Sequence, residues 1–148
     1  MFKKFDKKLY EENDHKGKIF ASSILKKMYP SYNIVEGDKF GVDLKVIDPK
    51  DNSIFITAEV EVRHNWNNDG DFPFSTINIP YRKQKFFNGK CKYFSINKNL
   101  NRCLIIDDKD ILNSPLEKNP NKYVSSNEKF YKVPVEKGKS ILGKDYIV

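Results

Sequence analysis

The sequence predicts a mixed α/β (α+β) fold, with a central β-sheet flanked by helices. A chain of 148 residues has the usual size of one domain, and 39% apolar residues are enough for one hydrophobic core. Apolar residues recur at helical spacing near the N-terminus and at every second position in two later segments. We therefore expect residues 1–148 to form a single domain.

The first expected element is a long amphipathic helix over residues 4–28, which ends before Pro30. Steps of three and four along its apolar stripe also pass through Glu12 and Lys16, so two charged side chains lie where a core face is expected. Gly17 leaves room for a close backbone approach. The apolar residues of the stripe are Phe5, Leu9, Phe20, Ile24 and Met28.

Two strands should follow, over residues 39–48 and 54–63, because apolar residues alternate there with a period of two. The intervening sequence PKDNS is a turn by composition, which predicts an antiparallel hairpin. The face opposite the Val and Ile side chains then carries Asp43 and Lys45 on the first strand, and Glu59, Glu61 and Arg63 on the second.

The rest of the chain is expected to form a long loop, short helices and further strands. Residues 64–80 are polar and contain Gly and Pro, as in a loop, and residues 80–89 are bounded by Pro80 and Gly89, as in a short basic helix. Pro134 favours an edge position for the last strand. The later elements are strands at 92–96 and 102–107, a short helix at 108–112, a loop at 113–127 and a strand at 129–136.

The net charge of +7 favours a polyanionic partner, with nucleic acid as the first candidate. The alternative is that a composition rich in Lys and Asn reflects a genome rich in A and T. Cys91 and Cys103 lack metal-ligand spacing, so we expect reduced core thiols. The sequence contains no signal peptide or apolar membrane segment, which predicts a soluble cytoplasmic protein without a membrane partner.

The predicted hairpin brings carboxylates together. With both apolar sets facing one core, Asp43 must lie beside Glu59 or Glu61, and three carboxylates converge. Clustered carboxylates resist ionising together without a cation, and oxygen ligands suit Mg²⁺ or Mn²⁺. The alternative is a solvated strand face with mixed charges. Glu12 could point to the same place if the helix packs on that face, or could mark a helix boundary or a kink.

These residues resemble the PD-(D/E)XK nuclease superfamily of restriction-endonuclease-like and Holliday-junction-resolving enzymes. The family pattern is a helix with a Glu, a strand with an Asp, a turn, and a strand with (D/E)-x-K. The matching pieces are Glu12, Asp43 in GVDLK, and EVEVR, within roughly residues 5–96. The resemblance implies a restriction-endonuclease-like core and a metal-dependent DNA endonuclease, specific for Holliday junctions or other branched DNA in recombination, repair or phage DNA processing.

The resemblance also implies site roles. Asp43, Glu59 and Glu61 would be metal ligands or would position water, with Glu12 nearby. The position of the family lysine falls on Glu61 or on Arg63, depending on which Glu is the acidic member, and both frames stay open. Arginine stays protonated and cannot act as a base, so Arg63 would steady a phosphate or the transition state. A homodimer would supply two active centres for cutting both strands.

Contacts with DNA are expected around this site. The basic residues of the short helix would hold the phosphate backbone, although such a charge run is also typical of an exposed helix face. Trp66, Phe72 and Phe74 would stack on unpaired bases or else pin the loop to the core. A non-catalytic binding module and a ribonuclease remain as alternatives. The expected nucleic-acid contacts are Lys16, Lys45, His64, Trp66, Arg82, Lys83 and Lys85.

Overall fold

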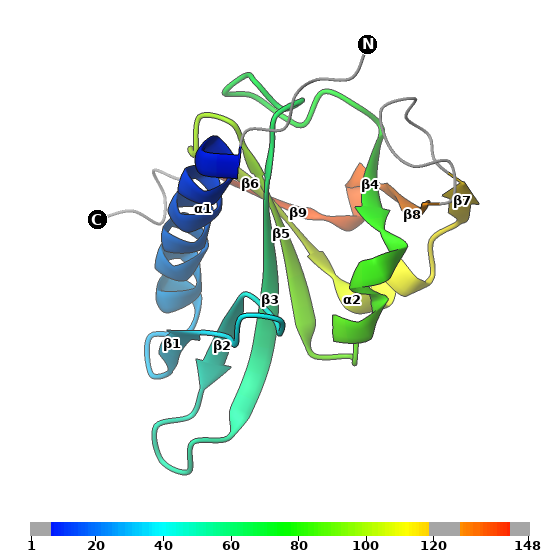
Figure 1. Cartoon of the computed structure of the whole chain (residues 1–148). Helices are drawn as coiled ribbons and strands as arrows, with labels where there is room; N and C mark the ends of the chain where they lie inside the picture. The colour runs from blue at the N-terminus through cyan, green and yellow to red at the C-terminus, as the bar shows by residue number, and fades with distance from the viewer. Residues whose placement is uncertain (1–6, 119–127, 143–148) are drawn as a thin grey trace.

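The computed structural model describes residues 7–118 and 128–142, which form a mixed α/β fold around a six-stranded sheet (Figure 1). The strands lie in the order β1-β2-β3-β5-β6-β9. β3 and β5 run parallel, and every other neighbouring pair is antiparallel, so the sheet is mixed. The strands are β1 (Asn33–Glu36), β2 (Leu44–Ile47), β3 (Ile54–Arg63), β5 (Cys91–Asn97), β6 (Arg102–Asp107) and β9 (Lys139–Leu142).

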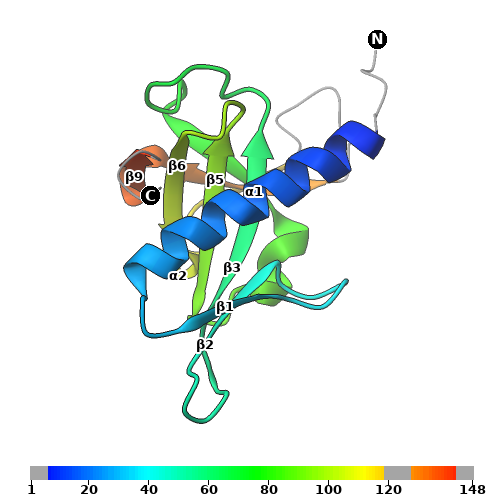
Figure 2. The ribbon, with the colours of Figure 1, turned by 90° about the vertical axis from the view of Figure 1, so that its left-hand side faces the viewer.

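The two faces of this sheet are covered differently. The long helix α1 (Lys7–Met28) lies across one face, as Figure 2 shows. A three-stranded sheet of β4 (Thr76–Pro80), β8 (Lys129–Pro134) and β7 (Leu116–Lys118) lies on the other side. The sheet was expected to be flanked by helices. α1 covers one face as expected, whereas the other face is covered by a second sheet with short helices beside it. These are η1 (Tyr81–Phe86), α2 (Asp108–Leu112) and η2 (Val135–Lys137).

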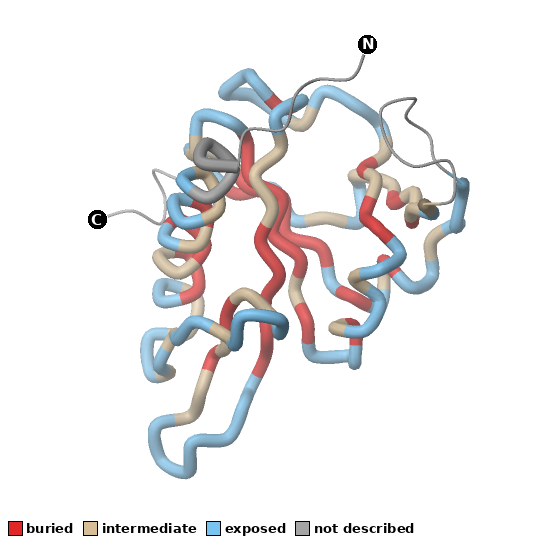
Figure 3. Tube along the Cα trace, in the orientation of Figure 1, coloured by how far each residue is buried: buried red, intermediate tan, exposed pale blue. Residues whose placement is uncertain are grey.

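Two hydrophobic clusters share the central sheet, whose strands form the buried middle of the molecule (Figure 3). Alternate residues of β3, among them Ala58 and Val60, face α1. The opposite face of β5 and β6 packs against β4 and β8, and the hydrophobic cluster between them includes the single tryptophan, Trp66, from the segment after β3. Because side chains alternate along a strand, Glu59 and Glu61 lie on the face turned away from α1.

Helix α1 packs closely on β3 through Gly17, as the sequence suggested. A Cβ atom at Gly17 would lie 2.8 Å from Cγ2 of Val62 and 3.4 Å from Cγ1 of Val60. The buried stripe runs from Phe20 back to Gly17, and Lys16 is exposed, as is Glu12. The expected stripe was therefore out of phase in its N-terminal half. Phe5 and Leu9 lie outside the residues whose side chains the structure describes.

Several strands were not predicted. β1, β4, β7 and β9 are three to five residues long, and β4 lies inside the segment expected to be a loop. The edge position expected for the last strand is wrong, because β8 is the middle strand of the small sheet. Pro134 is tolerated there since it is the final residue of β8, opposite Thr76.

Several expected elements and the free thiols are confirmed. β3 and α2 form where the sequence placed them, and β2 pairs antiparallel with β3 as the predicted hairpin. The first strand of that hairpin is shorter than expected, because β2 covers only Leu44–Ile47 and residues 39–43 are not in a strand. Cys91 and Cys103 are buried free thiols, and burial raises the pKa of Cys91 to about 12. Among the described residues no helix is long and apolar enough to cross a membrane.

We predict that Gly17→Ala lowers the free energy of unfolding, although alanine favours helix. The added methyl group would overlap Val62, and overpacking of this kind costs about 1–3 kcal/mol, more than the gain in helix propensity of up to about 1 kcal/mol. Urea unfolding of Gly17→Ala, Val62→Ala and the double variant measures the effect. The double variant should be more stable than the sum of the single changes predicts, because truncation of Val62 leaves space for the methyl group added at Gly17; strict additivity would contradict the contact.

Candidate active site

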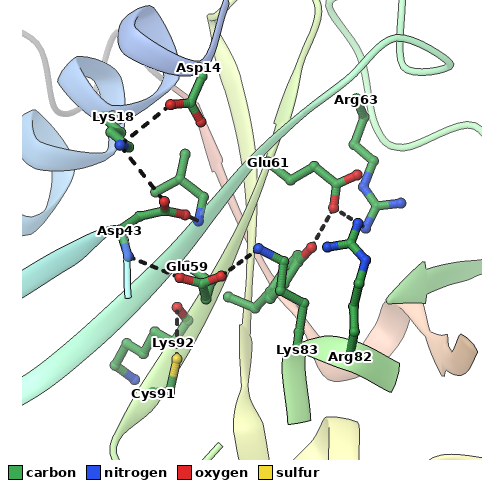
Figure 4. A network of polar contacts seen from close by, with 12 residues as sticks. Asp14, Lys18, Asp43, Glu59, Glu61, Arg63, Arg82, Lys83, Cys91 and Lys92 are labelled. Carbon is green, nitrogen blue, oxygen red and sulfur yellow. Dashed lines mark hydrogen bonds and ion pairs between the residues drawn. The ribbon is translucent and has the colours of Figure 1, made fainter. Parts of the chain in front are cut away.

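The site forms where β2 separates from β3. The last residue pair between these strands is Leu44 with Ala58, so Asp43 lies beside Glu59, one of the two neighbours that the sequence allowed. The Asp43 N–H donates to Oε2 of Glu59 at 2.9 Å, and the Val60 N–H donates to Oδ2 of Asp43 at 2.8 Å. These reciprocal hydrogen bonds, which we call the carboxylate bracket, hold both side chains in place (Figure 4).

Burial makes this pair difficult to ionise. The side chain of Glu59 is 1% exposed, whereas that of Asp43 is partly exposed. Burial raises the pKa of Asp43, against the hydrogen bond from Val60 and the charges of Lys83 and Lys18. Burial and then the charge of Asp43 raise the pKa of Glu59. The negative charge of Asp43 therefore disfavours ionisation of Glu59, as expected for two acids at one site.

Lys83 supplies the nearest positive charge. It belongs to η1, and its Nζ lies 2.7 Å from Oε1 of Glu59, so Glu59 is held by Asp43 on one oxygen and by Lys83 on the other (Figure 4). Burial alone would lower the pKa of Lys83, but the charge and hydrogen bond of Glu59 and the charge of Asp43 outweigh burial and raise it. Lys83 therefore stays protonated at neutral pH and cannot act as a base.

Helix α1 contributes Asp14 and Lys18, and not Glu12. Nζ of Lys18 lies 3.4 Å from Oδ2 of Asp14 and 3.8 Å from Oδ1 of Asp43. The expected approach of Glu12 to the site is not seen, because α1 packs on the apolar face of β3 and not on the face that carries Glu59, and Glu12 is exposed. Lys18, which is also paired with Asp14, reaches Asp43 beside the part of β3 that β2 does not pair with.

Glu61 is held apart from the bracket. Its Oε2 accepts a short hydrogen bond from the hydroxyl of Tyr93 and lies 3.3 Å from a terminal nitrogen of Arg63. The side chain of Arg63 is 10% exposed, and its Nε has no hydrogen-bond partner among the described residues. The expected convergence of three carboxylates is not seen: within residues 7–118 and 128–142, no three His, Cys, Asp or Glu side chains are grouped to hold a metal.

Two cavities meet at η1. One of about 310 Å³ contains Asp43 and Glu59, together with Arg82, Lys83, Lys85 and two phenylalanines. The other, of about 200 Å³, contains Glu61, His64, Tyr93 and Asp14, and again Arg82 and Lys83. Arg82 and Lys83 therefore border both cavities, while Arg63 lines neither.

The expected nucleic-acid contacts fall into three groups. Arg82, Lys83, Lys85 and His64 line the cavities. Lys16 is exposed on α1, and Lys45 lies 3.9 Å from Asp38. Trp66 is placed against the expectation: it is 1% exposed, and its indole N–H donates to the carbonyl of Gly70. Trp66 anchors the loop to the core and packs edge-to-face against Phe72, with 5.4 Å between the ring centres. Its buried indole cannot stack on a base.

The bracket fits a hard divalent cation in part. Mg²⁺ commonly binds through one or two carboxylates and keeps several water ligands. Asp43 and Glu59 provide such a pair of oxygen donors, and their raised pKa values are those of acids that a cation would help to ionise. They are therefore the residues that could hold Mg²⁺ or Mn²⁺, with Lys83 already beside Glu59.

Comparisons with family models, curated proteins and solved structures give no match. The sequence pointed to Asp43 and Glu59, but it missed Asp14 and Lys18, and it assigned Lys83 to the phosphate backbone. The sequence could have indicated Asp14 through the spacing of Gly17, Phe20 and Ile24. Asp14 lies one turn before Gly17 on the same side of the helix.

The raised pKa values predict how stability depends on pH. The folded protein binds more protons than the unfolded chain between the ordinary carboxyl pKa of about 4 and the raised values of Asp43 and Glu59. The contribution of these two groups to the free energy of unfolding should therefore fall as pH rises through that window and then level off. Urea unfolding across this range should show a smaller fall for the double variant Asp43→Asn, Glu59→Gln; equal slopes would contradict the shifts.

Removal of the Lys83 charge should destabilise the protein at neutral pH. Lys83→Met leaves Glu59 without its cation, at a cost of about 2 kcal/mol, below the 3–5 kcal/mol of a fully buried pair because Lys83 is 24% exposed. The loss should shrink toward acid pH, where the carboxylates take up protons. Lys85→Met is the matched control from the same helix and should change stability little; equal losses in both variants would contradict the role of the ion pair.

Proposed function

We propose that this chain is a metal-dependent DNA endonuclease of the PD-(D/E)XK type that hydrolyses phosphodiester bonds. The proposal rests mainly on the carboxylate bracket, which presents two acids with raised pKa values to a cavity with a basic rim. Such a cavity combines oxygen donors for a divalent cation with positive charges for phosphates. The order of a helix, an Asp, a turn and a strand with E-x-E supports a restriction-endonuclease-like core.

Asp43 and Glu59 would hold the metal, Mg²⁺ or Mn²⁺. When bound, the ion would polarise the scissile phosphate and lower the pKa of a water molecule. Lys83 favours the ionised form of Glu59 and places its ammonium group in the cavity that a phosphate would enter. Lys83 would therefore take the role that the family assigns to a lysine on the strand corresponding to β3. Glu61 lines the adjoining cavity and would accept the proton of the attacking water, which requires its carboxylate to leave Tyr93 and Arg63.

The basic groups of the rim are suited to the phosphate backbone and not to reading bases. Arg82 and Lys85 of η1 are exposed and line the same cavity as the bracket. Contacts of this kind fix the position of DNA without selecting its sequence. This favours an enzyme that recognises the shape of its substrate, such as branched DNA, as in recombination, repair or phage DNA processing.

A non-catalytic nucleic-acid-binding module is the second candidate. One observation favours it: Lys83 already neutralises Glu59, and Glu61 is engaged by Tyr93 and Arg63. Both candidates predict DNA binding through the basic rim, and they differ in turnover.

Cleavage assays separate the two candidates. Linear, single-stranded and four-way-junction DNA should be cut with Mg²⁺ or Mn²⁺ and not with chelator, and RNA in parallel tests for a ribonuclease. Asp43→Asn and Glu59→Gln should each lower the cleavage rate by about a hundredfold or more, since each removes a charged oxygen ligand. DNA binding measured in chelator should be retained. Binding without metal-dependent turnover on any substrate would favour the module.

A further inference from the structure

Phe40 is a large apolar side chain with no packing role. It is 85% exposed, whereas the other exposed large hydrophobic residues of the described chain range from 37% to 55%. Phe40 lies in the turn between β1 and β2, three residues before Asp43. A single exposed apolar side chain is common on protein surfaces, so what distinguishes Phe40 is its place in the cavity that contains the two bracketed carboxylates.

The turn that carries Phe40 is fixed by its backbone. The Gly37 N–H donates to the carbonyl of Asp43 at 3.0 Å, and the Gly41 N–H donates to that of Asp38 at 2.9 Å. A Cβ atom at Gly37 would lie 1.8 Å from the carbonyl oxygen of Val42, so only glycine allows this close approach. The ring of Phe40 is therefore held next to the site by the turn rather than by contacts of its own.

Phe40 and Phe86 line the same cavity as Asp43 and Glu59. Cations accompany both rings: Nζ of Lys39 lies 5.6 Å from the centre of Phe40, and Nζ of Lys85 lies 5.1 Å from the centre of Phe86. Aromatic faces alternating with positive charges are the pattern of single-stranded nucleic-acid sites, where bases stack and phosphates are neutralised.

We propose that this cavity binds an unpaired nucleotide of DNA, with its base stacked on Phe40 and its phosphates against Lys39, Arg82 and Lys85. This inference rests on the proposed function for the position of the scissile phosphate. It narrows the substrate to DNA that is single-stranded, flapped or frayed at the cleavage position. Bases inside a duplex cover one another and cannot use an exposed ring. The cations of the rim favour a nucleotide over an apolar segment of a protein partner.

Fluorescence provides a direct test. The native Trp66 is buried, so Phe40→Trp adds an exposed indole whose emission a stacked base quenches. In chelator, a single-stranded oligonucleotide should quench this variant strongly, and a duplex of the same sequence should quench it little. Phe55→Trp is the matched control, because Phe55 is 42% exposed, packs on Tyr32 and does not line the cavity. Equal quenching of both variants, or none by any DNA, would overturn the proposal.

Truncation of the ring tests its contribution. Phe40→Ala should weaken binding of single-stranded DNA about tenfold, the effect typical of one stacked base, while duplex binding stays unchanged. Phe55→Ala should leave both affinities unchanged, and circular dichroism verifies folding of each variant. Metal-dependent cleavage with unaltered affinity in Phe40→Ala would overturn this inference and leave the proposed function standing. Quenching and weakened binding without any cleavage would support the inference and count against the enzyme.

Discussion

The carboxylate bracket is the constraint on which the arrangement of the site depends. Asp43 replaces the missing strand partner of Val60 at the point where β2 departs, and Glu59 receives the N–H of Asp43 in return. Two acids that would otherwise repel each other are thus fixed by main-chain donors of opposite strands. Because the donors belong to the backbone, the sheet itself positions the two carboxylates. The neighbouring lysines then lower their pKa values against the effect of burial.

Lys83, Lys18 and the bracket form one electrostatic unit assembled from three layers of the fold. α1 supplies Lys18 from one face, the hairpin supplies both acids, and η1 supplies Lys83 from the other face. Burial lowers the pKa of each cation, but nearby carboxylates outweigh it: Asp14 and then Asp43 raise the pKa of Lys18, and Glu59 and then Asp43 raise that of Lys83. The site therefore depends on the packing of α1 and η1 on opposite faces of the sheet.

The sequence predicted what local periodicity controls and failed where distant segments meet. The alternation around Ala58 and Val60 identified β3 and limited the neighbours of Asp43 to two. The stripe of α1 was misread in its first half, because the close contact of Gly17 with Val62 sets the phase and involves residues 45 apart. The pairing of Lys83 with Glu59 likewise spans 24 residues, and no pattern within η1 indicates it.

The parallel pairing of β3 with β5 has a consequence for how the molecule assembles. The chain must cross from the end of β3 back to the start of β5, and this crossover contains both β4 and η1. Lys83 is part of this connection and can contact Glu59 only after the connection has packed against the sheet. A folding intermediate that contains only the hairpin would hold two acids without their counter-charge, so the hairpin alone would tolerate low pH better than neutral pH.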